Sequence, residues 1–82
     1  MEGGATLEKV LEIIKPFVKN PSALENANEK TRIMEDLGVN SARLVDIVLE
    51  FEDKFGIEID NDSADRVQTL GDAVQVIQEK MG

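Results

Sequence analysis

Apolar residues recur at steps of three and four in three stretches of the chain, with polar residues between them. This spacing places them on one side of a helix, because a helix turns about 3.6 residues per turn. The stretches are Leu7, Val10, Leu11, Ile14, Phe17 and Val18; then Leu44, Ile47, Val48, Phe51 and Phe55; and last Leu70, Ala73, Val74 and Ile77. The pattern therefore predicts three amphipathic helices.

Helix-capping and helix-breaking residues predict where these helices begin and end. Thr6 is placed to cap the first helix, and Pro16 should kink or end it near residue 15, because proline removes a helical hydrogen bond. Ser41 is the expected N-cap of the second helix, and Gly56 is its expected end. The run Thr69–Asp72 resembles a capping box before the last helix, which should reach about residue 80.

Two connections complete the prediction. Asn20–Pro21 closes the first segment, and a long connection follows, which Ile33, Met34 and Leu37 should anchor to the core. Ile57–Ile59 alternates like a strand but is too short to pair, and a short helix over residues 63–67 follows. The sequence thus predicts an all-α fold, a small four-helix bundle with a long first loop and a short third helix. Residues 1–5 should form a disordered leader and residues 6–82 a single domain.

Composition excludes several classes of function. The 82 residues include no cysteine and no histidine, so catalytic triads and zinc sites that need these side chains are impossible. Three phenylalanines, with no tryptophan or tyrosine, are too few for a base-stacking platform. An autonomous hydrolase and a nucleic-acid-binding protein are therefore not expected. It has no stretch for membrane insertion and no secretion signal, and we expect a cytoplasmic protein.

Acidic residues are concentrated in the middle of the chain. The net charge is −8, and ten acidic side chains lie between positions 35 and 65, where Arg43 and Lys54 are the basic residues. This region is either a solvated face or a docking surface for a basic protein. Along the second helix, the side opposite the apolar stripe mixes carboxylates with apolar residues: Ala42, Val45, Asp46, Leu49 and Asp53. Val45 and Leu49 either pack under the loop or face a partner.

A calcium site was tested against the acidic turn. Counted from Asp60, a twelve-residue calcium loop would need a ligand at Ala64, glycine at Asp65 and a carboxylate at Gly71, so the match fails at three positions. Capping of the short helix by Asp62 or Ser63 explains these residues better. No metal site is predicted, although loose binding of a divalent ion stays open.

Ser41 is the residue that carries candidate chemistry. A serine at the start of a helix is most simply an N-cap. A phosphodiester on its hydroxyl would instead meet free backbone N–H groups and the positive end of the helix dipole. That position therefore favours an attached phosphate.

The segment around this serine is similar to the signature of the acyl carrier proteins. The matching residues are Glu35-Asp36-Leu37-Gly38-Val39-Asn40-Ser41 and Leu44 to Ile59, and the similarity continues from Thr69 to Ile77. It covers nearly the whole chain from Leu7. The resemblance implies a carrier, not a catalyst, whose Ser41 bears a 4'-phosphopantetheine arm from coenzyme A. Acyl groups would be held as thioesters on the arm's terminal sulfur.

The resemblance also implies partners and a docking face. The partners would be a phosphopantetheinyl transferase, an acyl-loading ligase or transferase, and synthases with basic patches, meeting a monomeric carrier. The docking residues implied are Ala42, Arg43, Val45, Asp46, Leu49, Glu50, Glu52 and Asp53. A bundle of this family can also shelter an acyl chain, here among Ile47, Val48, Phe51 and Ala73.

The flanks of the serine depart from the family's usual Asp-Ser-Leu. Here the chain reads Asn40-Ser41-Ala42, followed by Arg43, which loses one carboxylate and adds one cation beside the attachment point. Attraction to the usual basic patches should weaken, which favours a specialised carrier over the housekeeping fatty-acid carrier. Carriers of an aminoacyl, aryl or polyketide unit are alternatives, as is an acidic helical interaction module without an arm.

Overall fold

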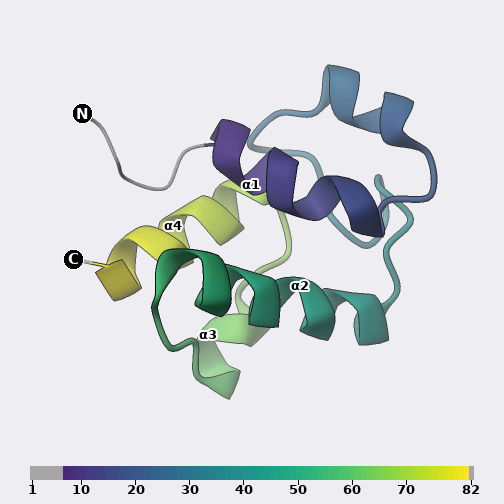
Figure 1. Cartoon of the computed structure of the whole chain (residues 1–82). Helices are drawn as coiled ribbons and strands as arrows, with labels where there is room; N and C mark the ends of the chain where they lie inside the picture. The colour runs from purple at the N-terminus through teal and green to yellow at the C-terminus, as the bar shows by residue number, and fades with distance from the viewer. Residues whose placement is uncertain (1–6, 82) are drawn as a thin grey trace.

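Four α-helices and two short 3₁₀ helices make up the chain between residues 7 and 81, the part that this computed structural model describes. They are α1 (Leu7–Ile14), η1 (Lys15–Phe17), η2 (Pro21–Asn26), α2 (Ser41–Phe55), α3 (Asn61–Asp65) and α4 (Leu70–Met81), shown in Figure 1. The all-α bundle with a long first loop and a short third helix is confirmed. The predicted leader over residues 1–5 and the cap at Thr6 lie outside the described residues.

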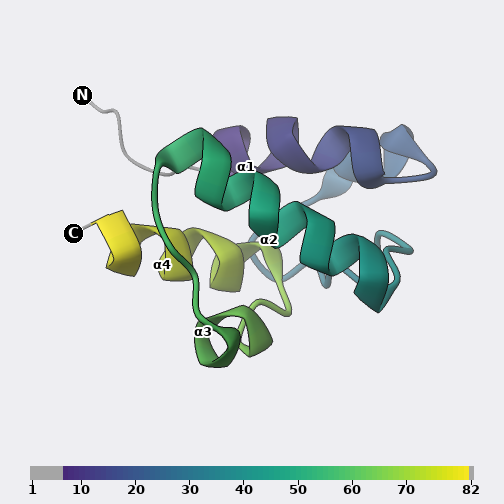
Figure 2. The same cartoon turned by 60° about the horizontal axis from the view of Figure 1, so that its bottom comes forward.

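The helices pack around one apolar core. α2 runs back along α1 in the opposite direction, and α4 contacts both, while α3 lies at the side of the bundle (Figures 1 and 2). The fully buried side chains come from all three long helices and from both connections: Val10, Ile14, Ile33, Ile47, Phe51, Val67, Leu70, Ala73, Val76 and Ile77. The buried stripes follow the predicted apolar spacing, except that α4 also buries Val76 and leaves Val74 half-buried. Hydrophobic burial therefore positions the helices.

The first helix ends where proline requires it to. α1 stops at Ile14 and the chain tightens into η1, with Pro16 in its first turn. Asn20 then caps η2, because its side chain accepts a hydrogen bond from the N–H of Ser22 at 3.2 Å. The early end of the first helix is confirmed, and η2 was missed in the sequence.

Of the three residues predicted to anchor the long connection to the core, two are buried and one is not. Ile33 and Leu37 are buried, as is Val39, but Met34 is 44% exposed. The N–H groups of Asp36 and Leu37 both donate to the carbonyl of Arg32, which closes a tight turn. Residues 33 and 37 of that turn face inward, and Met34 therefore lies on its outer side.

Backbone hydrogen bonds join this connection to the start of α4. The three bonds, each 2.9 Å long, are Ile33 N–H to Gln68 O, Leu70 N–H to Thr31 O, and Gly71 N–H to Glu29 O. The capping box is confirmed: Thr69 Oγ1 accepts from the N–H of Asp72, and an Asp72 carboxylate oxygen accepts from the N–H of Thr69, both at 3.1 Å. Two segments far apart in sequence are thus held side by side.

The short third helix begins two residues earlier than predicted and ends at Asp65. Asp60 takes the N-cap position with an extended backbone, so neither Asp62 nor Ser63 is the cap. Ser63 is instead buried, and its side chain hydrogen-bonds to Asp60. Residues 57–59 form no strand, and the half-buried Ile57 and Ile59 pack against the core.

Candidate functional site

Ser41 is the first residue of α2 rather than its cap. The cap is Asn40, whose side-chain oxygen accepts a hydrogen bond from the N–H of Arg43 at 2.8 Å. The predicted N-cap role of Ser41 is therefore wrong. Ser41 is exposed, and its hydroxyl takes part in no hydrogen bond within residues 7–81. The side chain is free for chemistry because its neighbour caps the helix.

Two hollows open beside Ser41. One, of about 300 Å³, lies toward the loop and is bordered by Met34, Val67 and Gln68. The other, of about 280 Å³, lies between α2 and α3 and is bordered by Val45, Leu49 and Ile59. Ser41, Leu44, Ala64 and Asp65 border both. A group attached to Ser41 could therefore extend into either hollow, passing Leu44 on one side or the other.

Charged contacts hold α3, the far wall of these hollows, against α4. The guanidinium of Arg66 bonds both carboxylate oxygens of Glu79, at 3.1 and 2.8 Å, and Lys80 lies 3.3 Å from Asp60. The bond to Arg66 lowers the pKa of Glu79, and the hydrogen bond from Ser63, followed by Lys80, lowers the pKa of Asp60. Both carboxylates stay charged to lower pH than usual, which keeps the contacts intact.

The outward side of α2 is apolar and acidic, as the helical pattern predicted. Val45 is 59% exposed and Leu49 is 55% exposed, so neither packs under the loop. Asp46 and Asp53 are exposed on the same helix. Exposed large apolar residues beside carboxylates are typical of a surface that meets another protein.

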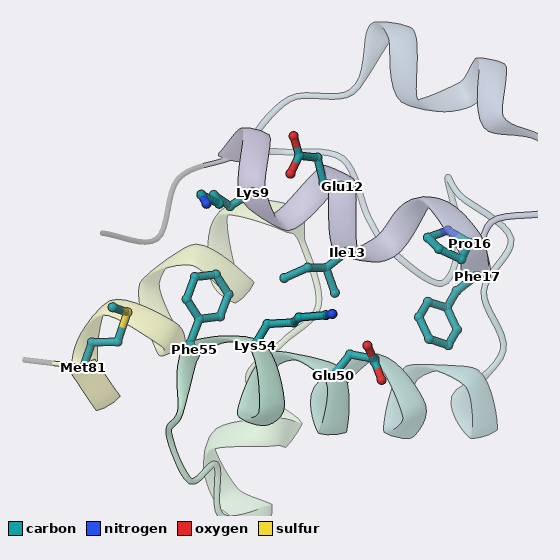
Figure 3. Close-up of a pocket in the computed structure, with 9 residues that line it drawn as sticks. All are labelled: Lys9, Glu12, Ile13, Pro16, Phe17, Glu50, Lys54, Phe55 and Met81. Atoms are coloured by element: carbon teal, nitrogen blue, oxygen red, sulfur yellow. The ribbon is translucent and has the colours of Figure 1, made fainter. Parts of the chain in front are cut away.

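Two of the predicted docking residues, Glu50 and Glu52, are half-buried rather than exposed. Glu52 is half-buried, and its carboxylate accepts a hydrogen bond from the N–H of Ile59 at 2.6 Å, so it holds the α2–α3 connection. Glu50 borders a groove between α1 and α2, together with Lys54 and Phe17 (Figure 3). The geometry leaves Val45, Asp46, Leu49 and Asp53, with Ala42 and Arg43, as one exposed set.

The buried residues implied as an acyl shelter differ in their access. Ile47, Phe51 and Ala73 are completely closed in the core. Val48, in contrast, borders the hollow that starts at Ser41 between α2 and α3. An acyl chain from Ser41 would meet Val48 first, and the other three only if the core opened.

The described residues 7–81 hold neither a metal-binding cluster nor a membrane-spanning helix. Within residues 7–81, no group of three or more His, Cys, Asp and Glu side chains is placed to hold a metal ion. No helix in this range is long and apolar enough to cross a bilayer. The acidic turn at Asp60–Ser63 instead serves the contact between α3 and α4.

Two features define the class of protein: an exposed serine at a helix N-terminus beside apolar hollows, and an acidic helix face next to it. Comparison with known proteins agrees. Residues 8–77 match the family described as "Phosphopantetheine attachment site". The chain therefore belongs to the phosphopantetheine-attachment family of acyl carrier proteins.

Individual relatives carry the same name. The chain is 47% identical over 58 residues to an acyl carrier protein of Phenylobacterium zucineum, covering 71% of this chain and 73% of that one. It is 30% identical over 80 residues to one of Thermotoga maritima, covering 95% and 99%. A solved structure of the acyl carrier protein from Enterococcus faecalis superposes with a TM-score of 0.74 at 32% identity, covering 90% and 91% of the two chains.

Family membership establishes the coarse function. The protein is a carrier with a covalently attached 4'-phosphopantetheine, not an enzyme. It interacts with a phosphopantetheinyl transferase and with biosynthetic enzymes. The interpretation as an acidic module without an arm is thereby set aside.

Proposed function

We propose that Ser41 is the residue that bears the phosphopantetheine arm, and that the chain presents acyl intermediates to enzymes of fatty-acid or specialised lipid and metabolite biosynthesis. The observation that carries this proposal is the position of Ser41. It is exposed, it begins α2, and its hydroxyl has no other task in the described structure. The other two serines differ, because Ser63 is buried and the Ser22 hydroxyl donates to Asn20 at 2.6 Å.

The residues around Ser41 suit a phosphodiester and a long arm. The first N–H groups of a helix have no carbonyl partner in that helix, and the side chain of Asn40 accepts from the N–H of Arg43. The N–H groups of Ser41 and Ala42 remain to hold a phosphate, and the helix dipole favours its charge. The arm supplies the thiol that carries the acyl group as a thioester. The chain's own part is to hold the phosphate end and to present the adjoining apolar hollows.

The exposed set on α2 would direct partners to that arm. Val45 and Leu49 offer apolar contact, while Asp46 and Asp53 offer charges to basic patches. A small face of this kind gives fast association that weakens with salt, and it lets each enzyme release the carrier quickly. Tethering then raises the effective concentration of the cargo at each active site.

The flanks of Ser41 support a specialised pathway. Asn40 caps α2, and Arg43 places a cation where the family usually has none, so partners must accept a different charge pattern. We further propose that residues 6–82 form one carrier domain, that it acts as a monomer, and that it works in the cytoplasm. Cargo stays open between acyl, aminoacyl, aryl and polyketide units, since one arm serves all of them.

The experiment is the intact mass after incubation with coenzyme A and each of several phosphopantetheinyl transferases. Wild type should gain the mass of one phosphopantetheine, and Ser41→Ala should gain none. The matched control is Ser22→Ala, because Ser22 also lies in a first helical turn after a capping asparagine. This control should load like wild type. Loading of Ser41→Ala would show that the arm is attached elsewhere.

A further inference from the structure

The first turn of α2 carries a positive charge, which is unfavourable at the N-terminus of a helix. α1, α3 and α4 each have a carboxylate in the first turn, at Glu8, Asp62 and Asp72, whereas α2 has none and has Arg43 at its third position. The positive end of the helix dipole favours anions and disfavours a cation there. A Gln or Glu at this position could also reach back to the capping residue in a capping box. Apart from an exposed pair with Asp46, helix stability therefore gives no reason for Arg43.

The guanidinium of Arg43 is available to a partner. Its side chain is 62% exposed, and its ion pair with Asp46 spans 3.8 Å. Exposed pairs of this kind are weak, because water competes for both charges. Arg43 can therefore exchange Asp46 for a carboxylate on another protein at little cost.

A second cation lies on the same flank of the site. A hollow bordered by Arg43 and Lys19 separates the end of the first helical segment from the turn Gly38–Asn40, and no acidic residue borders it. We call Lys19 and Arg43 the basic flank. Lys19 is exposed and follows η1, which the early end of α1 at Pro16 brings to this place.

The opposite side of Ser41 has the other sign. Asp65 borders both hollows on that side, accompanied by Glu35 in one and Glu52 in the other. Arg32 also lies there, paired with Glu35 at 3.0 Å and Asp36 at 3.7 Å, but carboxylates outnumber it around the two hollows. Ser41 thus stands on a boundary between a basic flank and an acidic one.

We propose that the basic flank contacts carboxylates on the phosphopantetheinyl transferase that attaches the arm to Ser41. These carboxylates would lie beside the opening of the transferase's active site. The proposal rests on Ser41 being the attachment residue. A chain with a net charge of −8 attracts any basic surface, but attraction of one sign does not set an orientation. A positive contact on one side of Ser41 and negative contacts on the other fix how the carrier is turned when the hydroxyl meets the enzyme.

The chemistry of the partner follows from this arrangement. Its carrier-binding face should bear acidic side chains that meet Lys19 and Arg43, and basic side chains that meet Asp65 and Glu35 on the other side of Ser41. An enzyme whose face is basic throughout would meet Arg43 with a like charge, which selects against it. The basic flank would therefore determine which transferase serves this carrier.

The test is the loading rate of charge variants by the transferase that loads wild type fastest. Arg43→Glu should lower kcat/KM for the carrier about tenfold and Arg43→Gln about threefold at low salt, and both losses should shrink at high salt. Lys19→Glu should lower it about as much as Arg43→Glu. The control is Lys9→Glu, which makes the same charge change at the far end of α1 (Figure 3) and should stay within about twofold of wild type.

Stability separates docking from folding. Neither Arg43→Gln nor Arg43→Glu should lower the melting temperature, because both remove a cation from a helix start. Slower loading of an equally stable carrier would support the proposal.

Three results would overturn it. One is faster loading of Arg43→Glu, which would mean a basic enzyme surface at that point. Another is an unchanged kcat/KM for the carrier with a raised KM for coenzyme A, which would mean that the cations bind phosphates of that substrate. The third is equal loading of all variants. Loading of Ser41→Ala as fast as wild type would instead show failure of the attachment proposal itself.

Discussion

Gly71→Ala should destabilise the fold, although alanine is the better helix former. Gly71 lies in the first turn of α4, and a Cβ atom there would stand 2.9 Å from the carbonyl oxygen of Glu29 and 3.1 Å from its Cβ. The N–H of Gly71 also donates to that same carbonyl at 2.9 Å. The added methyl group must therefore push the two backbones apart where they are hydrogen-bonded.

The magnitude follows from three opposing contributions. Helix propensity favours alanine over glycine by at most about 1 kcal/mol, and by less in a first turn. Overpacking costs about 1 to 3 kcal/mol, and the weakened hydrogen bond about 1 kcal/mol more. The free energy of unfolding should therefore fall by about 1 to 3 kcal/mol. With a urea slope near 1 kcal/mol per molar, the unfolding midpoint should fall by about 1 to 3 M.

Urea unfolding followed by far-UV circular dichroism is the suitable assay, since the chain has no tryptophan or tyrosine to report by fluorescence. Amide exchange should also become faster at Ile33 and Leu70, whose N–H groups donate across the same junction. The control is Gln75→Ala, an exposed change within α4 that should shift stability by less than about 0.5 kcal/mol. A Gly71→Ala variant as stable as wild type, or more so, would refute the steric argument.

Three further changes test the site and its supports. Asn40→Ala should cost about 1 kcal/mol because it removes the cap of α2, while Ser41→Ala should cost less than about 0.5 kcal/mol; equal losses in urea unfolding would contradict this assignment. Glu52→Ala should cost about 1 to 2 kcal/mol and Glu52→Gln less, because the amide oxygen still accepts the loop N–H; equal costs would argue against that bond. Arg66 lowers the pKa of Glu79, so its stabilisation is present above the ordinary carboxyl pKa and lost as pH falls through the lowered value. The stability difference between wild type and Glu79→Gln should thus be present at neutral pH and disappear in acid, and a difference that persisted there would exclude a charge effect.

Local chemistry explains why the three long helices could be predicted from the sequence. Pro16 ends the first segment by removing a donor, and the Thr69–Asp72 box satisfies the first donors of α4. Gly56 ends α2 with φ at 65°, a left-handed backbone that glycine adopts without strain. Each signal acts within four residues, so it is present in the sequence alone.

Contacts between distant residues explain what could not be predicted. Both Asn40 and Ser41 are good caps, and burial of Val39 in the core decides which of them precedes the first turn. The exposure of Met34 depends on a turn closed at Arg32, and that segment is tied to α4, more than thirty residues away. Nothing near these residues in the sequence reports such pairings.

The candidate site also contains residues that could be predicted from local sequence and residues that could not. The place of Ser41 at the start of α2 and the outward position of Val45 and Leu49 could be predicted from this helix by itself, and all three side chains are exposed. The place of Lys19 could not be predicted in this way, because η1 and the turn Gly38–Asn40 together bring it beside α2. A helical pattern assigns residues to one face of one helix, and it cannot report what a second element adds to that face.

The division of tasks between Asn40 and Ser41 links the fold to the proposed function. If Ser41 capped α2, its hydroxyl would be occupied by a backbone N–H, and modification would remove the cap. Because Asn40 accepts that bond, the hydroxyl of Ser41 can be modified without loss of the helix start. A phosphate added there would lie at the positive end of the α2 dipole, which favours its charge. Attachment of the arm should therefore leave the bundle intact or slightly more stable.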